Sequence, residues 1–561
     1  MTKPGQKKQG RNRRPAIAAV LATAAIATAL SACTATPPQP RQSQSETSSP
    51  SASTPEPEPT LGGYGVSAGH PLAAQAGEQM LERGGTAVDA AIAAAFADAV
   101  MQPASSGIGG GGVSIVVADG SAQNYEYREV VNQAGRIPEG GAGIPGFVAG
   151  MERLHRDHGN LPWADLLAPA IQIADSGGPV SRYLASSINS PYGQDITRSL
   201  PQFRRADGTP LREGDLLVQT DLAETMSNLA EEGPDSLYTG TLAQILSKTP
   251  GIDKESLAAY EVDVFEPAAG PVGEYTMLSG APALPGAAII QMAQIAEAAG
   301  IADVDPDSPE FVDLLSRAWQ VADASVQEYF GDPRFVDVPV DRLTDPEQNA
   351  QIAATLPDAA ETTSRSAALG GYESAPNTTH ISVVDANGVA VSMTNTITNY
   401  WGSGQYVAGF FLNDQLERFS DVGRTDTNRP EPGRRSVTWS SPSMLLDAQQ
   451  RPVLVIGTPG GRQIPSTTAS VITRWALHGQ PLETAVPAGR FILTDGELRL
   501  ETPQLADGTR ALGYDVVVAD EASRANYGSV QALAINWETG GVSSFADERR
   551  SAGFVEGRMD D

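Results

Sequence analysis

Apolar and polar positions along the chain predict a mixture of helices and strands after residue 60. Residues 73–82 and 86–101 are rich in alanine and free of helix breakers, so both are predicted to be helical. Residues 381–384 are rich in β-branched side chains, residues 385–388 carry the turn-forming Asp-Ala-Asn-Gly, and residues 389–396 return as a second extended run. This pattern predicts a β-hairpin. With no internal repeat, the periodicity indicates an α/β or α+β protein without choosing between them.

Two glycine-rich stretches adjoin further predicted strands. Residues 105–112 read Ser-Ser-Gly-Ile-Gly-Gly-Gly-Gly and lead into an apolar run at 113–117. Such a loop can bind phosphate, but this one enters a strand and lacks a following Lys-Ser or Lys-Thr, so close backbone packing is the preferred interpretation. The apolar run at 453–456 leads into Pro-Gly-Gly at 459–461, which is compatible with a simple tight turn.

The first 60 residues have a different composition from the rest. A basic start is followed by an apolar segment at 16–30, and Leu-Ser-Ala-Cys at 30–33 resembles a bacterial lipobox. We therefore expect a signal peptide over residues 1–32, lipidation of Cys33, and a membrane anchor on the outer face of the cell. The alternative is a plain secretory signal with an incidental cysteine. Residues 33–60 are rich in Pro, Ser and Thr and are predicted to form a disordered stalk.

Charge and cysteine content narrow the possible partners. The 561-residue chain has a formal net charge of −29 and a single cysteine, Cys33. Loss of a leader with six basic and no acidic residues would make the mature chain more acidic still. This balance argues against nucleic acid as a partner. With Cys33 used for lipidation, neither disulfides nor thiolate metal sites are expected, and we predict no metal or organic cofactor.

The predicted hairpin opens with a candidate nucleophile, Thr378. A threonine hydroxyl is a weak nucleophile until a base removes its proton, and a free α-amino group, with a pKa of about 7.7–8.0, can act as that base. Thr378 would gain such an amine only if the bond between Asn377 and Thr378 were cut. On the hairpin alone, an ordinary threonine-rich strand entry is the simpler interpretation.

The surrounding residues resemble a known family. Asn-Thr-Thr-His-Ile-Ser-Val-Val-Asp at 377–385 looks like the segment at which γ-glutamyltranspeptidases cut themselves in two. Further similar segments follow the family's order, at 84–91, 107–112, 125–129, 143–150, 413–420 and 459–461. The resemblance implies an N-terminal-nucleophile hydrolase fold of the α+β class, a four-layer αββα sandwich. It also implies a large chain, residues 61–377, that pairs with a small chain, residues 378–561.

The resemblance also implies roles for individual residues. Thr378 would be the nucleophile and its α-amine the base, while Thr379 would assist self-cleavage of the Asn377 peptide bond. Thr396 matches a hydroxyl residue that hydrogen-bonds the nucleophile. The backbone amides of Gly460 and Gly461 match the family's oxyanion hole. In other enzymes, the loss of one oxyanion-hole donor costs about 2.7–4 kcal/mol, so this is expected to be a large share of catalysis.

Residues expected to bind the acyl group only partly follow the family pattern. Arg128 matches an arginine that grips the substrate's α-carboxylate, which a guanidinium can do bidentately. Gln415 matches one residue of the family segment that holds the substrate's α-amino group. Arg418, however, stands where a second acid is expected, and a cation repels an ammonium group.

Four more positions of the predicted pocket are unusual. Thr398 occupies a usual asparagine position, although the neighbouring Asn399 could substitute for it. Thr438 and Trp439 replace a pair of serines that contact the carboxylate. These departures concern the substrate and leave the predicted catalytic residues untouched.

Three functions follow as hypotheses. The leading one is a γ-glutamyltransferase or glutathione hydrolase that passes the acyl group to water or to an amine. The second is an acylase of the same fold acting on glutaryl-like diacids without an α-amine, for which Arg128 and Arg418 would suit two carboxylates. The third is an inactive lipid-anchored binding protein, against which the presence of Thr378 and Thr396 counts.

Overall fold

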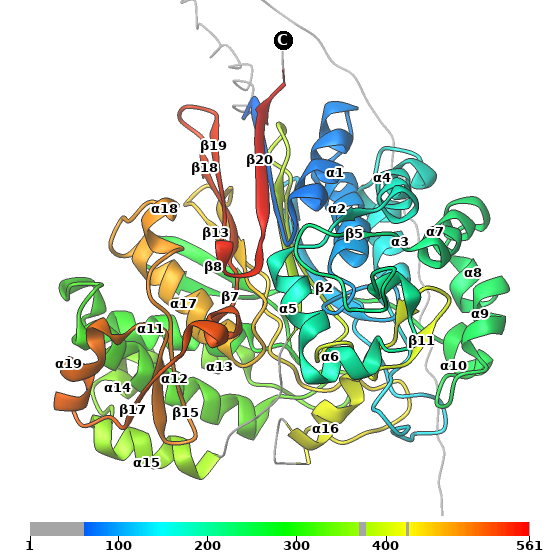
Figure 1. The fold of residues 1–561 in the computed structure, drawn as a ribbon. Helices are drawn as coiled ribbons and strands as arrows, with labels where there is room; N and C mark the ends of the chain where they lie inside the picture. Colours follow the sequence, from blue (N-terminus) through cyan, green and yellow to red (C-terminus); the bar gives the residue numbers. More distant parts are fainter. Residues whose placement is uncertain (1–60, 370–376, 422–425, 560–561) are drawn as a thin grey trace, which may run out of the picture. The chain divides into compact units, whose positions relative to one another are not determined.

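A computed structural model of the chain describes residues 61–369, 377–421 and 426–559. The predicted signal peptide, Cys33 and the predicted stalk lie outside these residues. The structure contains two antiparallel sheets stacked face to face, with helices on both outer faces (Figure 1). This is the predicted αββα arrangement, so the expected α+β fold class is confirmed.

The first sheet contains the predicted hairpin at its centre. In spatial order its strands are β20 (Gly553–Arg558), β1 (Gly63–Ala68), β9 (Thr379–Val384), β10 (Ala390–Thr396), β2 (Gly111–Ala118), β3 (Ser121–Glu126) and β6 (Asp263–Phe265). Every neighbouring pair is antiparallel. The turn between β9 and β10 closes where Asp385 N donates to Val389 O at 3.0 Å. The predicted strands at 113–117, 381–384 and 389–396 are therefore confirmed.

The second sheet is formed largely by the C-terminal part of the chain. Its strands are β19 (Gly541–Ala546), β18 (Gln531–Asn536), β14 (Pro452–Gly457), β13 (Ser443–Leu446), β8 (Tyr275–Ser279) and β7 (Ala268–Val272). It packs on the first sheet through contacts of β9 and β10 with β14 and of β1 with β18 and β19. β14 contains the predicted strand at 453–456 and brings the following glycines to the hairpin.

Two helical layers enclose the sheets. In Figure 1 one helical layer lies on the right, beside the first sheet, and the other lies at the lower left, beside the second. Helices next to the first sheet are α1 (Pro71–Glu82), α2 (Ala87–Met101) and α3 (Phe147–His158), with α4 (Trp163–Ser176) and α7 (Thr220–Glu232) outside them. Helices on the second sheet are α11 (Gly286–Ala298) and α17 (Gln463–Ala476), with α12 (Pro309–Tyr329) packed on both.

Shorter elements connect the layers. The remaining helices are α5 (Arg182–Asn189), α6 (Pro191–Ile196), α8 (Asp235–Tyr238), α9 (Thr241–Leu246), α10 (Lys254–Ala258), α13 (Val340–Leu343), α14 (Pro346–Ala353), α15 (Ala359–Leu369), α16 (Arg418–Asp421), α18 (Leu482–Ala485) and α19 (Ala506–Ala511). The small sheets comprise β4 (Gly178–Pro179) with β5 (Leu216–Leu217), β11 (Tyr406–Val407) with β12 (Phe410–Phe411), and β15 (Phe491–Thr494) with β16 (Glu497–Leu500) and β17 (Val516–Val518).

Helix α2 shows why its alanine-rich sequence forms a central helix. Thr86 caps its first turn, and the side chain of Asp89 returns a bond to Thr86 N at 2.9 Å, which completes a capping box. All of its residues are buried, so it needs small side chains on every face. Ile381 and Val383 of β9 point into the same apolar cluster, whereas Val384 packs between the sheets. Both predicted alanine-rich helices are confirmed as α1 and α2.

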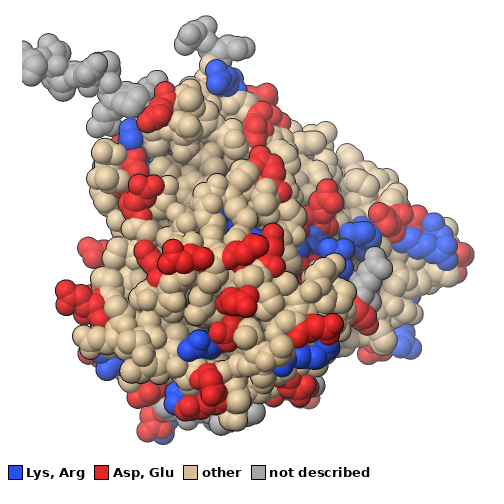
Figure 2. Space-filling model, turned by 90° about the vertical axis from the view of Figure 1, so that its left-hand side faces the viewer, with Lys and Arg blue, Asp and Glu red and all other residues tan. Residues whose placement is uncertain are grey.

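The acidic surplus of the sequence lies on the surface. On the face shown in Figure 2, Asp and Glu side chains are scattered over the molecule and do not gather into one patch. Within the described ranges, no helix combines the length and apolarity needed to cross a bilayer.

Candidate active site

Two threonine hydroxyls meet at one end of the central hairpin. Thr378 directly precedes β9, Thr396 ends β10, and both side chains are buried. The Thr378 Oγ1 atom lies 2.5 Å from the Asn377 carbonyl oxygen, and Thr396 Oγ1 donates to the same oxygen at 2.6 Å. The two hydroxyl oxygens are 3.3 Å apart. Both hydroxyls therefore converge on the carbonyl of the peptide bond that precedes Thr378.

Asn377 is held on all sides in this uncut chain. Its backbone N–H donates to Thr398 O at 3.1 Å, and its side-chain amide donates to Ala104 O. Its Oδ1 atom accepts from Tyr183 Oη at 2.9 Å and from Thr378 N at 3.1 Å. Tyr183 was not predicted as a site residue, because nothing in the sequence of a helix 194 residues earlier indicates this contact.

Thr398 shapes the turn that follows Thr396. Its φ is +84°, in the left-handed region that a β-branched residue rarely adopts, and such conformations cost about 1–3 kcal/mol. In this turn Thr398 N donates to Thr396 Oγ1 at 2.8 Å, and Thr398 Oγ1 donates to Gln415 Oε1 at 2.6 Å. Because the Thr396 oxygen accepts the Thr398 N–H, its own proton is directed to the Asn377 carbonyl.

Of the two predicted glycines, Gly461 lies beside the threonines, and Gly460 directly precedes it. β14 ends at Gly457, and the loop turns at Gly460 (φ +141°) and Gly461 (φ +56°) before α17 begins. Both φ values favour glycine. Gly461 lines the same small cavity as Thr378. Within the described part of the chain, neither glycine N–H has a hydrogen-bond acceptor.

A small cavity extends from the threonines. We call it the acyl cavity, and its lining residues are Thr378, Thr396, Thr398, Gln415, Arg418, Thr438, Trp439, Ser440, Gly461 and Ile464. Its volume of about 10 Å³ has room for about one water molecule. Arg418 is its charged member, and none of these lining residues carries a carboxylate. Seven residues that the sequence predicted to bind the substrate or to take part in catalysis thus line this cavity together with Gly461.

Arg128 occupies a different place from the acyl cavity. Its buried guanidinium donates to both oxygens of Glu126, at 2.7 and 3.3 Å, and to Ser436 O at 2.7 Å. Gln415 Nε2 donates to Ser436 Oγ at 2.9 Å, so Ser436 connects Arg128 with the cavity wall. Arg128 itself is not among the lining residues.

Asn399 also stands behind the cavity. It donates to Asp414 through its backbone N–H at 3.0 Å and through Nδ2 at 2.6 Å, and it accepts from Arg418 Nη2 at 3.2 Å. Burial raises the pKa of Asp414 to about 7, although the bonds from Asn399 oppose this shift. Nearby, burial raises the pKa of Glu129 to about 8. Neither carboxylate oxygen of Glu129 has a hydrogen-bond partner among the described residues.

Two residues beside the nucleophile connect it to a neighbouring loop and to neighbouring strands. Thr379 Oγ1 donates to Ser106 Oγ at 3.0 Å, in the glycine-rich loop. His380 lies between the sheets, with Nδ1 2.8 Å from Thr394 Oγ1. Its ring packs so closely on Gly457 that a Cβ there would lie 2.2 Å from it. Burial lowers the pKa of His380 to about 3, so a neutral ring joins the hairpin to β14.

Comparison with known proteins supports the family suggested by this geometry. The family model described as gamma-glutamyltranspeptidase matches residues 73–556. A glutathione hydrolase proenzyme of Pseudomonas aeruginosa is 34% identical over 546 residues, covering 88% of this chain and 95% of the relative. The capsule biosynthesis protein CapD proenzyme of Bacillus anthracis is 32% identical, covering 87% and 90%.

Acylases are also among the similar proteins. The acylase ACY 1 proenzyme of a Pseudomonas species is 33% identical, covering 84% of this chain and 89% of the relative. A crystal structure of cephalosporin acylase from Bacillus halodurans matches the fold with a TM-score of 0.77 at 23% identity, covering 90% of this chain and 98% of that one. On the match of its family model, the chain belongs to the gamma-glutamyltranspeptidase family.

Proposed function

We propose that this protein is a self-processing γ-glutamyltransferase or glutathione hydrolase that forms a γ-glutamyl-enzyme on Thr378. The observation that carries the proposal is the convergence of the Thr378 and Thr396 hydroxyls on the Asn377 carbonyl. Family membership and relatives named glutathione hydrolase proenzyme support it.

Processing would begin in the uncut chain. Thr378 Oγ attacks the Asn377 carbonyl carbon while Thr396 donates to the carbonyl oxygen. The C–N bond breaks, the Thr378 nitrogen takes up a proton, and Asn377 becomes esterified to Thr378. Water then hydrolyses the ester, which leaves a carboxylate on Asn377 and a free α-amine on Thr378. Thr379, anchored to Ser106, holds the start of β9 in place during this step.

Turnover would use the same hydroxyl with its new base. The α-amine of Thr378 removes the hydroxyl proton as Oγ attacks the γ-carbonyl of the substrate, and it returns the proton to the leaving amine. The free N–H groups of Gly460 and Gly461 stabilise the oxyanion. Water or a second amine then releases the acyl group from Thr378.

A same-fold acylase for glutaryl-like diacids is the second candidate, and the lining of the acyl cavity favours it. Arg418 lines this cavity. A γ-glutamyl substrate carries an ammonium group there, which an acidic side chain would bind and a cation repels. Trp439 adds a buried indole N–H without a partner among the described residues. Both groups are donors that suit a carboxylate, and acylases occur among the relatives.

Matched chromogenic substrates separate the two candidates. The purified two-chain protein is assayed with γ-glutamyl and glutaryl p-nitroanilides, which differ only in the α-amine. Higher kcat/KM for the γ-glutamyl compound is the expected result, together with a small chain that gains the mass of one γ-glutamyl group when the reaction is quenched. Equal or better glutaryl cleavage would favour the acylase, and cleavage of neither would favour an inactive binding protein.

The location of the enzyme is also a proposal. The lipobox-like residues 30–33 support a signal peptide over residues 1–32, a lipid on Cys33, and a stalk over residues 33–60 that holds the enzyme outside the membrane. Labelled palmitate should enter the full-length protein in a bacterial host and fail to enter a Cys33→Ser variant. Equal labelling of both proteins would contradict the anchor.

A further inference from the structure

The side chain of Asn377, the residue before the proposed cut, is held at both ends of its amide group. Its nitrogen Nδ2 donates to the backbone carbonyl oxygen of Ala104. Its oxygen Oδ1 accepts from the Tyr183 hydroxyl at 2.9 Å and from Thr378 N, the nitrogen of the bond to be cut, at 3.1 Å. Because an acceptor faces one end and donors face the other, the amide is held in one orientation, with its oxygen toward the bond.

The Tyr183 hydroxyl is fixed as a donor toward Asn377. The amide oxygen can only accept, so the single hydroxyl proton of Tyr183 lies between these two residues. Tyr400 Oη, which is 2.7 Å from Tyr183 Oη, must then donate to Tyr183. Burial raises the pKa of Tyr183 well above its ordinary range, although the guanidinium of Arg550, 5.1 Å from the ring centre, opposes this shift. Tyr183 therefore keeps its proton at neutral pH.

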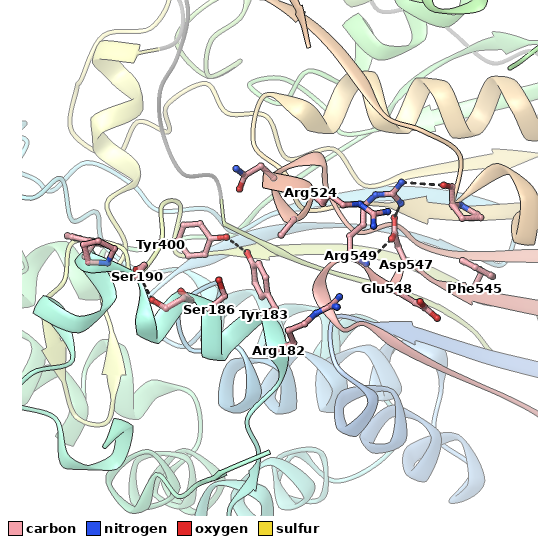
Figure 3. A pocket seen from close by; sticks show the side chains of 16 residues that line it. Arg182, Tyr183, Ser186, Ser190, Tyr400, Arg524, Phe545, Asp547, Glu548 and Arg549 are labelled. Atoms are coloured by element: carbon pink, nitrogen blue, oxygen red, sulfur yellow. Dashed lines mark hydrogen bonds and ion pairs between the residues drawn. The ribbon is translucent and has the colours of Figure 1, made fainter. Parts of the chain in front are cut away.

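The helix that carries Tyr183 packs against the segment that carries Tyr400. Leu184 of α5 belongs to the same buried apolar cluster as Ile397 and Trp401, which follow β10. Figure 3 shows Tyr183 on α5 directed toward Tyr400, and both residues line a pocket of about 1030 Å³. Packing of α5 on this segment thus fixes the place of the Tyr183 hydroxyl independently of its bond to Asn377.

The hydrogen bond between Thr378 N and Asn377 Oδ1 becomes stronger during self-cleavage. In the uncut chain the Thr378 nitrogen is a neutral amide. When the C–N bond breaks, this nitrogen takes up a proton, which balances the proton that the Thr378 hydroxyl loses. Hydrogen bonds to charged groups are about twice as strong as those between neutral groups. An Asn377 oxygen held in place therefore stabilises the leaving nitrogen more in the transition state than in the uncut chain.

We propose that Tyr183 is a positioning residue for self-cleavage, because its hydroxyl holds the Asn377 side chain against the leaving nitrogen. This inference rests on the proposed function, in which Thr378 cuts the chain. Tyr183 acts through Asn377 and does not contact the reacting carbonyl itself. This role ends with the cut, because Asn377 and Thr378 are no longer joined afterwards.

A double-mutant cycle on the full chain tests this role. Uncut chain is made in a short cell-free pulse with labelled methionine, and its loss is followed on denaturing gels. Tyr183→Phe removes the hydroxyl and keeps the ring that packs beside Arg550 and Tyr400, so the variant should fold. We expect it to be cut about three- to tenfold more slowly, which is the usual effect of one neutral hydrogen bond.

The other variants separate positioning from a general effect on packing. Asn377→Ala removes the acceptor of the Tyr183 bond, so adding Tyr183→Phe to it should slow the cut no further. Tyr192→Phe, at an exposed tyrosine of α6, is the matched control and should be cut at the rate of the unaltered chain.

Two results would overturn the inference while the proposed function stands. One is a Tyr183→Phe chain that is cut as fast as the Tyr192→Phe chain. The other is the same slowing by Tyr183→Phe with and without Asn377→Ala, which would show that the hydroxyl does not act through Asn377. If the unaltered chain is never cut, the proposed function fails and this role fails with it.

Discussion

The catalytic end of the hairpin and the acyl cavity are neighbours built in different ways. Thr378 and Thr396 are fixed by strands β9 and β10 and by bonds to one backbone carbonyl. Arg418 and Trp439, in contrast, project into the cavity from segments outside the sheets. The sequence predicts that the first region follows the family pattern and that the second departs from it. If both predictions hold, the reaction mechanism and the choice of acyl group can change independently.

The largest effect is expected at the catalytic end. Thr378→Ala removes the hydroxyl and leaves no route to the free amine, so hydrolysis of the preferred anilide should fall by about 10³-fold or more. Thr378→Ser keeps a hydroxyl and should still be cut and active, at a reduced rate. Steady-state assays of the three proteins measure this, and an active alanine variant would contradict the role of Thr378.

Thr396 should matter less than the nucleophile but more than the other residues that line the acyl cavity. Thr396→Ala removes one donor from the reacting carbonyl, and such a bond to a group that becomes charged is worth about 1.5–3 kcal/mol. Self-cleavage followed on denaturing gels should therefore slow roughly 10- to 100-fold. Thr396→Ser retains the hydroxyl and serves as the control. Equal rates for the alanine and serine variants would show that the Thr396 hydroxyl does not assist self-cleavage.

Arg418 should control substrate choice without controlling the mechanism. Arg418→Asp places an anion where a substrate ammonium is expected, so the ratio of kcat/KM for γ-glutamyl over glutaryl anilide should rise tenfold or more, which is about 1.4 kcal/mol. Arg429→Asp, at an exposed arginine, is the matched control. An unchanged ratio in Arg418→Asp would show that specificity is set elsewhere.

The smallest effect concerns stability and the buried Glu129. Its pKa is raised by burial to about 8, so the folded chain keeps a proton that the unfolded chain has released above about pH 4.5. This group therefore lowers the free energy of unfolding as the pH rises from about 4.5 to 8. Glu129→Gln cannot titrate, and its melting temperature should fall less between pH 5 and pH 8. Glu139→Gln, at an exposed position, is the control and should behave like the unaltered protein. If the melting temperature of Glu129→Gln falls as much between pH 5 and pH 8 as that of Glu139→Gln, the effect is refuted.

Local patterns in the sequence predict much of the fold but only part of the candidate site. The hairpin at Thr378 and helices α1 and α2 follow from turn chemistry and residue propensities. The contact of Tyr183 with Asn377 and the strained φ of Thr398 depend on tertiary packing, which leaves no local signal. The bidentate contact of Arg128 with Glu126, two residues away, likewise appears only when the chain is folded.

The mass of the intact purified protein tests the central claim most directly. A soluble form that starts after the stalk is incubated and measured beside its Thr378→Ala counterpart. If Thr378 cuts the chain, the unaltered protein gives two chains, with the smaller one beginning at Thr378, and the variant gives a single chain. A single uncut chain for the unaltered protein after long incubation, or a cut elsewhere, would contradict the N-terminal threonine as nucleophile.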